Sequence, residues 1–199
     1  AVRGAAFYLD SLRQQRRTAE YSAEDKKEFF GLLPPSISHE GYSAKPMHSY
    51  WDDFFALRGF ADAAFLAKTL GRAGDAERFG AIHDEFQHDL VASIVAAQAR
   101  HKIDYIPGCA DLGDFDATST TIALEPVGAL DALPRTAVER TFDKYWEYFD
   151  KRRKNAIEWT DYTPYETRVI GSFVRLGQRD RANAALEFFM HDRRPPGWN

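Results

Sequence analysis

The sequence contains a single cysteine, Cys109, and no run of apolar residues long enough to cross a membrane. One cysteine excludes an intrachain disulfide and leaves the redox compartment open. A spanning helix needs about 18 or more consecutive apolar residues, and no segment approaches that length. The sequence does not begin with a charged segment followed by an apolar stretch, which is the pattern typical of a signal peptide. We therefore expect a soluble protein without membrane contact, and favour the cytoplasm over the periplasm or secretion.

A long run of positive charge is also missing from the sequence. The chain has 26 Lys and Arg against 30 Asp and Glu, which gives a formal net charge of −4 at pH 7. Proteins that bind nucleic acids or anionic membranes need grouped Lys and Arg side chains to neutralise phosphates. This composition therefore predicts no nucleic-acid partner.

Several catalytic signatures are absent: the phosphate loop and the G-x-G-x-x-G, G-x-S-x-G, C-x-x-C and H-E-x-x-H motifs. The histidines are scattered, and His83 and His88 would not share a helix face, so we expect no metal site. No pattern calls for a cofactor. Chemistry by paired carboxylates needs none of these motifs and stays open.

What the sequence does have is the composition and spacing of helices. Alanine is abundant and the β-branched residues Val and Ile are few, which favours helix over strand. Apolar residues recur every three or four positions in most segments. We predict an all-α fold of about eight helices in four hairpins, which form a single domain over residues 1–199.

Short turns and long loops alternate between these predicted helices. Gly71 and Gly177 each end a helix in a tight turn, whereas the connections 33–48 and 101–116 are long. Long loops in a compact domain are usually functional or disordered, and these are rich in aromatic and acidic residues. We therefore predict a layered helical barrel in which both long loops lie at one end and face one cavity.

Two capping patterns predict helix starts in the polar segments. Ser22 with Asp25 has the spacing of a capping box, which predicts a short helix that ends near Gly31. Pro164 with Glu166, after a threonine, predicts a second start with Pro in the first helical position.

The first candidate site lies where the first long loop enters the most apolar helix. The face of Trp51 can pack on the C–H surface of a sugar, and the Asp52 carboxylate can accept hydrogen bonds from two neighbouring hydroxyls. His48 and Tyr50 flank this pair. The alternative is structural, because Ser49 and Asp52 have capping-box spacing and acids in a first turn are favoured by the helix dipole.

The second candidate site is an acidic stretch with Asp111, Asp114 and Asp116. Three neighbouring carboxylates are costly unless they are solvated, bind a cation or share a proton, and a shared proton raises one pKa, as a general acid requires. Alternatively, Asp116 caps the next helix and the other two are solvated. A calcium loop is a further alternative, although the spacing lacks the glycine and distal glutamate of an EF-hand.

Two further segments carry candidate residues. Glu166 lies beside Tyr165 and Arg168, although its spacing also fits a purely structural cap. Trp198 lies in a Pro- and Gly-containing stretch at the end of the sequence.

The ordered set of these pieces resembles a known family. Residues 50–55 resemble the Trp-Asp sugar-binding motif of trehalases and related processing glucosidases. The pair Asp111-Leu112 is similar to the Asp-Leu-Asn segment of that family, with Gly113 in place of Asn. Residues 197–199 are similar to a Gly-Trp element on a late loop of those enzymes.

The resemblance, which spans about residues 31–199, implies part of a six-hairpin (α/α)6 toroid and an inverting glycoside hydrolase that acts on an oligosaccharide or glycoside. It implies that Asp111 or Asp114 is the general acid. Together with the patterns above, it assigns substrate binding to His48, Tyr50, Trp51, Asp52, Glu166 and Trp198. The base of that family is a carboxylate beyond the Gly-Trp element, so we expect the base and part of the toroid to lie outside this sequence. Exposed helix flanks would then favour self-association or pairing with the rest of the domain.

Two other functions remain open at this point. The chain could be a non-catalytic carbohydrate-binding or interaction module of the same helical type. It could also be a sugar lyase or epimerase, which would need a basic pocket and a Tyr/His pair. His48 with Tyr50 is the candidate for such a pair, and the acidic second loop disfavours a polyanionic substrate.

Overall fold

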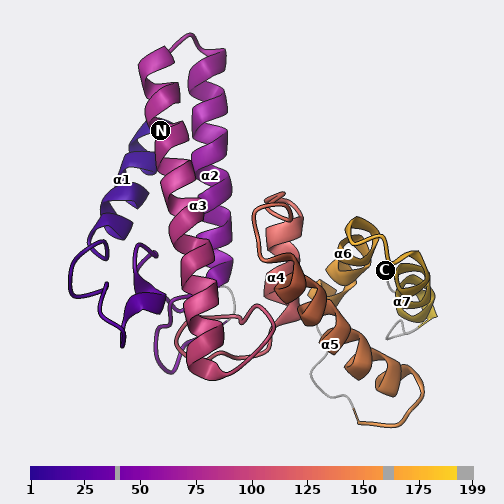
Figure 1. The fold of residues 1–199 in the computed structure, drawn as a ribbon. Helices are drawn as coiled ribbons and strands as arrows, with labels where there is room; N and C mark the ends of the chain where they lie inside the picture. Colours follow the sequence, from indigo (N-terminus) through magenta and orange to yellow (C-terminus); the bar gives the residue numbers. More distant parts are fainter. Residues whose placement is uncertain (39–40, 159–163, 192–199) are drawn as a thin grey trace.

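The computed structural model describes residues 1–38, 41–158 and 164–191. Within these ranges the fold consists of α-helices and short 3-10 turns, with three isolated β-bridges and no strand (Figure 1), which confirms the prediction of an all-α fold. The helices are α1 (Val2–Gln14), α2 (Tyr50–Thr69), α3 (Ala73–His101), α4 (Ala117–Leu124), α5 (Arg135–Arg153), α6 (Arg168–Arg175) and α7 (Arg179–His191). None of the described helices combines the length and the apolar character that crossing a membrane requires.

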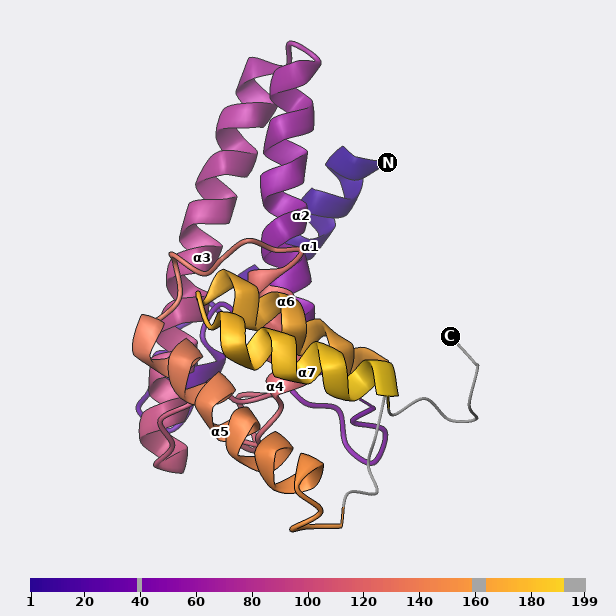
Figure 2. The same ribbon diagram turned by 90° about the vertical axis from the view of Figure 1, so that its right-hand side faces the viewer.

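The helices after α1 pack as consecutive pairs. α2, α4 and α6 contact one another in chain order, and α3, α5 and α7 each pack against the helix that precedes them. The long antiparallel α2–α3 pair stands out in Figure 1, and Figure 2 shows α6 and α7 running side by side. The described chain therefore forms an inner row, α2–α4–α6, with an outer helix beside each member.

The apolar residues explain why these helices are the inner ones. α2 is apolar on most sides, and Phe60 contacts Phe86 of α3 edge to face with ring centroids 5.7 Å apart. In α4 every residue except Thr118 is buried. Phe142 of α5 contacts Phe173 of α6 in the same edge-to-face manner, with centroids 6.1 Å apart. A short helix buried on all sides is stabilised by this packing rather than by its own length.

The helix predicted before residue 31 is replaced by a series of turns. Tight turns run through residues 16–32, and only Lys27–Phe29 form a 3-10 turn. Few apolar residues recur at helical spacing in this stretch, so a regular helix would bury little surface. The described helices therefore form three pairs and a separate α1, and not the four hairpins expected.

The start predicted at Pro164 is also different from the α-helix expected. Residues Pro164–Thr167 form a 3-10 turn, and α6 begins only at Arg168. The Glu166 carboxylate accepts hydrogen bonds from α5, and Thr163, the predicted cap residue, lies outside the described residues.

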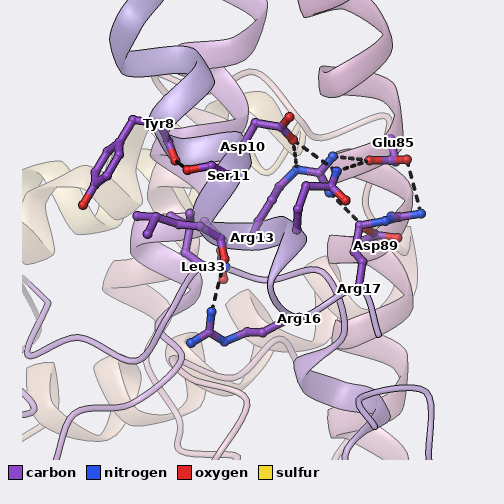
Figure 3. Close-up of polar contacts among 12 residues, drawn as sticks. Tyr8, Asp10, Ser11, Arg13, Arg16, Arg17, Leu33, Glu85 and Asp89 are labelled. Carbon is purple, nitrogen blue, oxygen red and sulfur yellow. Dashed lines mark hydrogen bonds and ion pairs between the residues drawn. The ribbon is translucent and has the colours of Figure 1, made fainter. Parts of the chain in front are cut away.

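An ion-pair cluster joins α1 to α3 (Figure 3). The fully buried guanidinium of Arg13 pairs with Glu85 and, at 3.2 Å, with Asp89. Arg17 pairs with the same two carboxylates. Gly31, with φ of +70°, packs directly against Asp89 and leaves no room for a Cβ atom. Buried charges of this kind need their partners, because an unpaired one is strongly destabilising.

Candidate functional site

The loops that precede α2 and α4 are joined at the N-terminal ends of these helices. Ser49 and Cys109 form an antiparallel bridge. The Tyr50 backbone N–H donates to the Gly108 carbonyl at 3.0 Å, and the Ala110 N–H donates to the His48 carbonyl at 3.0 Å. The prediction that both long loops lie at the same end is confirmed. That they face one cavity stays a prediction. We call this surface the two-loop site; its polar side chains are Ser36, Ser38, Tyr42, His48, Asp52, Asp111 and Asp114.

Asp52 is turned toward the first loop and does not serve as a capping residue. Its carboxylate accepts hydrogen bonds from the hydroxyls of Ser36 and, at 3.0 Å, of Ser38. The Ser38 hydroxyl also lies 3.0 Å from that of Ser49. Ser49 makes no side-chain capping bond to α2, so the capping-box alternative for this pair is wrong. Asp52 is instead a half-buried acceptor in the loop surface.

Asp111 is held by His48 through two separate donors. The His48 backbone N–H donates to Asp111 Oδ2 at 2.6 Å, and the ring Nδ1 lies 3.2 Å from the same oxygen. Burial raises the pKa of Asp111, but the hydrogen bonds from His48 more than offset this, and the pKa lies below its usual value. Asp111 is therefore ionised at neutral pH. The other face of the His48 ring stacks on Phe29, with centroids 4.4 Å apart.

Asp114 is the acceptor at the centre of the second loop. It accepts from the Tyr42 hydroxyl at 2.9 Å and from the Cys109 backbone N–H at 3.0 Å. Burial and the nearby Asp114 charge raise the pKa of Tyr42, so this hydroxyl keeps its proton and donates it. The same two causes raise the pKa of the Cys109 thiol to about 12, so Cys109 stays a neutral thiol.

Gly108 allows this arrangement because it has no side chain. A Cβ atom there would lie 2.7 Å from Asp114 Oδ2 and 3.0 Å from the Tyr42 hydroxyl. Real Cβ atoms essentially never approach other atoms that closely. The sequence shows Gly108 only as one loop glycine among several.

Asp116 has the structural role that its position suggests. Its carboxylate accepts from the Ser119 backbone N–H at 3.0 Å and from the Ser119 hydroxyl at 2.7 Å, which caps α4. The capping interpretation of Asp116 is thus confirmed. In the ranges that the structure describes, no three His, Cys, Asp or Glu side chains are placed to hold a metal ion.

Tyr50 and Asp53 face the core. Tyr50 is fully buried, and its hydroxyl lies 2.8 Å from that of Ser93. Asp53, which the sequence analysis did not single out, is only 1% exposed and accepts one hydrogen bond, from the Leu33 backbone N–H. Burial raises the pKa of Asp53 to about 8, so the group is protonated at neutral pH. Its position three residues after Tyr50 and four before the buried Leu57 is the signal that could have revealed it.

Trp51 connects the two-loop site to α6. It is 8% exposed, and the guanidinium carbon of Arg168 lies 5.0 Å from the centre of its ring. The same guanidinium lies 4.4 Å from the ring centre of Tyr165. The Nη1 atom of Arg168 is buried and has no hydrogen-bond partner in the described structure. The sequence analysis named Arg168 only as a neighbour of Glu166.

Glu166 is part of a buried ion pair. It is 5% exposed, and its carboxylate accepts from Arg152 at 2.9 and 3.0 Å and from the Tyr145 hydroxyl at 2.7 Å. These partners lie on α5, so Glu166 fixes the segment before α6 to that helix. Trp198 lies outside the described residues.

Two hollows of about 380 Å³ each lie away from the two-loop site. One is lined by α2, α3 and residues 127–132, and the other by the end of α5 and by α7. Neither hollow is lined by a residue that the sequence analysis assigned to substrate binding or catalysis.

Comparison of the chain with models of protein families, with curated proteins and with solved structures finds no match. The chemistry of the two-loop site has to be inferred from its own residues.

Proposed function

We propose that this chain is a segment of a glycoside hydrolase and that the two-loop site binds the sugar. The observation that carries the proposal is a continuous set of contacts that joins an acid in the first turn of α2 to an acid of the second loop. Asp52 bonds to Ser38 and through it to Ser49. Ser49 pairs with Cys109, whose backbone N–H bonds to Asp114. Half-buried carboxylates gathered in this way suit the hydroxyl groups of a sugar.

The packing of the helices also supports the proposal. A toroid of helical hairpins has an inner row of helices with an outer helix beside each. The α2–α4–α6 row and its partners have this relation over the described part of the chain. The two long loops lead into inner helices at their N-terminal ends, which gives a single functional face.

The proposal gives each carboxylate of the site a different role. Asp52, beside Trp51, accepts hydrogen bonds from sugar hydroxyls. An ionised carboxylate cannot donate a proton, so the low pKa of Asp111 disfavours it as the general acid, and Asp114 is the remaining candidate. An inverting hydrolase needs a second carboxylate to activate water, and we assign that role to no described residue.

A second candidate function, carbohydrate binding without hydrolysis, is favoured by one specific observation. Asp52, Asp111 and Asp114 all accept hydrogen bonds from protein donors, and the pKa of Asp111 is lowered by those from His48. The protonated Asp53 is fully buried and bonded to Leu33. Carboxylates that act as hydrogen-bond acceptors bind hydroxyls without protonating a leaving group.

Binding and turnover measured on the same variants test the proposal and separate the two candidates. We expect Asp52→Asn and Asp114→Asn each to weaken the binding of simple glycosides, measured by calorimetry, by about tenfold. Asp62→Asn is the matched control, because Asp62 lies on α2 but is exposed and pairs only with Arg58 among the described residues. Turnover is measured in a protein that also contains the base carboxylate. Hydrolysis of aryl glycosides that is lost in Asp114→Asn would support the hydrolase, whereas binding without turnover in that protein would support the second candidate. Unchanged binding in both site variants would contradict the proposal.

A further inference from the structure

The guanidinium of Arg168 has ring contacts but no anionic partner in the described part of the chain. It lies 5.0 Å from the ring centre of Trp51 and 4.4 Å from that of Tyr165. The attraction between the guanidinium and the two rings offsets part of the free-energy cost of removing this charge from water. It does not supply an acceptor for the buried Nη1 atom, which makes no hydrogen bond within the described residues. A buried donor without an acceptor is costly, especially on a charged group.

Two acids near Arg168, Glu166 and Glu125, pair with other arginines. Glu166 accepts from Arg152 and Tyr145. Glu125 pairs with Arg175, the other arginine of α6. Arg168 is thus a partly buried cation with one guanidinium nitrogen that no described residue satisfies.

The place of Arg168 connects it to the two-loop site. Trp51, the ring against which it lies, is followed directly by Asp52, and the Tyr50 N–H on the other side bonds to the second loop. A ligand that contacts both Asp52 and the Trp51 ring would also meet the guanidinium that lies on this ring. The site aspartates already accept hydrogen bonds from the protein, so a negative group of the ligand would be directed to Arg168.

We propose that Arg168 binds the carboxylate of an acidic sugar, and that the ligand of this site is a uronic acid glycoside. This inference rests on the proposed function and names its substrate class. A planar guanidinium matches a carboxylate in shape and charge, so one or two N–H groups can donate to it. The sugar ring would lie on the Trp51 side, with its hydroxyls toward Asp52.

Pairs of sugars that differ only at one carbon test this inference on the full chain. The probes are methyl glucuronides and methyl galacturonides, each compared with its neutral hexoside by calorimetry. We expect the native protein to bind at least one uronide about tenfold more tightly than its hexoside. Arg168→Gln should remove this preference, so that the uronide and its hexoside bind with the same affinity. Arg175→Gln, on the same helix but exposed, should keep the preference.

Each outcome bears on one of the two proposals. Equal binding of uronide and hexoside, or a preference that survives in Arg168→Gln, would overturn the inference and leave the proposed function standing. Acetate that binds as tightly as the uronide would also overturn it, because the site would then recognise a bare anion. If Arg168→Gln does not fold, Arg168→Lys replaces it, since Lys keeps the charge but loses the planar guanidinium. An undiminished preference of Arg168→Lys for the uronide would overturn the proposed geometry. Binding of no sugar at all would overturn both proposals.

Discussion

Asp111 accepts a hydrogen bond from the backbone N–H of His48 at 2.6 Å, and its carboxylate also lies 3.2 Å from the ring Nδ1 of the same residue. One carboxylate therefore fixes both the path of the chain and the orientation of a side chain just before α2. Because Asp111 comes from the second loop, this pair links the entrances of two inner helices.

The first prediction concerns the stability that this pair contributes. Asp111→Asn should lower the free energy of unfolding by about 1–3 kcal/mol at pH 7, because a charged acceptor becomes a neutral one. The native pKa of Asp111 is lowered, so its contribution is present above the unfolded value of about 4 and is lost as the pH falls through the lower native value. Urea unfolding of both proteins should show a difference that shrinks below about pH 4. A difference that stays constant down to pH 3 would contradict this assignment.

The second prediction has the opposite sign and concerns Asp53. Its native pKa is raised to about 8, so the native state holds a proton that the unfolded state releases above about pH 4. Stability should therefore fall with rising pH, by up to about 1.4 kcal/mol per pH unit between about pH 4 and 8. Asp53→Asn should flatten this dependence, since Asn keeps an acceptor for Leu33 and does not titrate. Parallel stability curves for both proteins would show that Asp53 is not protonated in the native state.

The third prediction contrasts two glycines. Gly108→Ala should displace the Tyr42–Asp114 pair, because the new Cβ would lie 2.7 Å from the carboxylate. We expect a loss of about 1–3 kcal/mol in stability, together with weaker sugar binding. Gly59→Ala, in the middle of α2 with nothing within 4 Å of the new Cβ, should instead stabilise the protein by about 0.5–1 kcal/mol. Thermal unfolding of the two variants should shift in opposite directions.

The fourth prediction concerns Glu166, the buried ion-pair partner of Arg152 on α5. Glu166→Gln should destabilise the fold by about 2–5 kcal/mol, because it removes a buried carboxylate from Arg152 and Tyr145. Glu139→Gln is the control, since Glu139 pairs with Arg135 on an exposed face and should contribute less than about 1 kcal/mol. Equal small losses in urea unfolding would mean that the Glu166 pair contributes no more than a surface pair.

Local sequence patterns predicted the helices of this protein better than the placement of its polar groups. The periodicity of α2 and α3 and the tight turns at Gly71 and Gly177 depend on neighbouring residues, so they can be read along the chain. The cap formed by Asp116 is equally local. The prediction of a helix that ends near residue 31 was wrong, because a capping pattern alone does not supply an apolar face.

The candidate site depended on contacts that no local pattern contains. Ser49 and Asp52 have the spacing of a capping box, yet Ser36 and Ser38 hold the carboxylate away from the helix. Asp52 and Asp53 are neighbours in sequence, but only Asp53 points into the core. The stacking of Arg168 on Trp51 joins segments whose meeting is decided by the packing of α6 beside α4.

The ion-pair cluster between α1 and α3 has a consequence for the order in which the protein folds. The α2–α3 pair is closed by a short turn, whereas the bonds from Arg13 and Arg17 to Glu85 and Asp89 join residues 68 to 76 positions apart. Closing so long a loop costs more conformational entropy than closing a hairpin. The buried ion pairs offset this cost only when all of their partners are in place. We therefore expect α1 to dock late onto a preformed hairpin, and to detach first. Native-state hydrogen exchange should show amide protons of α1 exchanging well before those of α2.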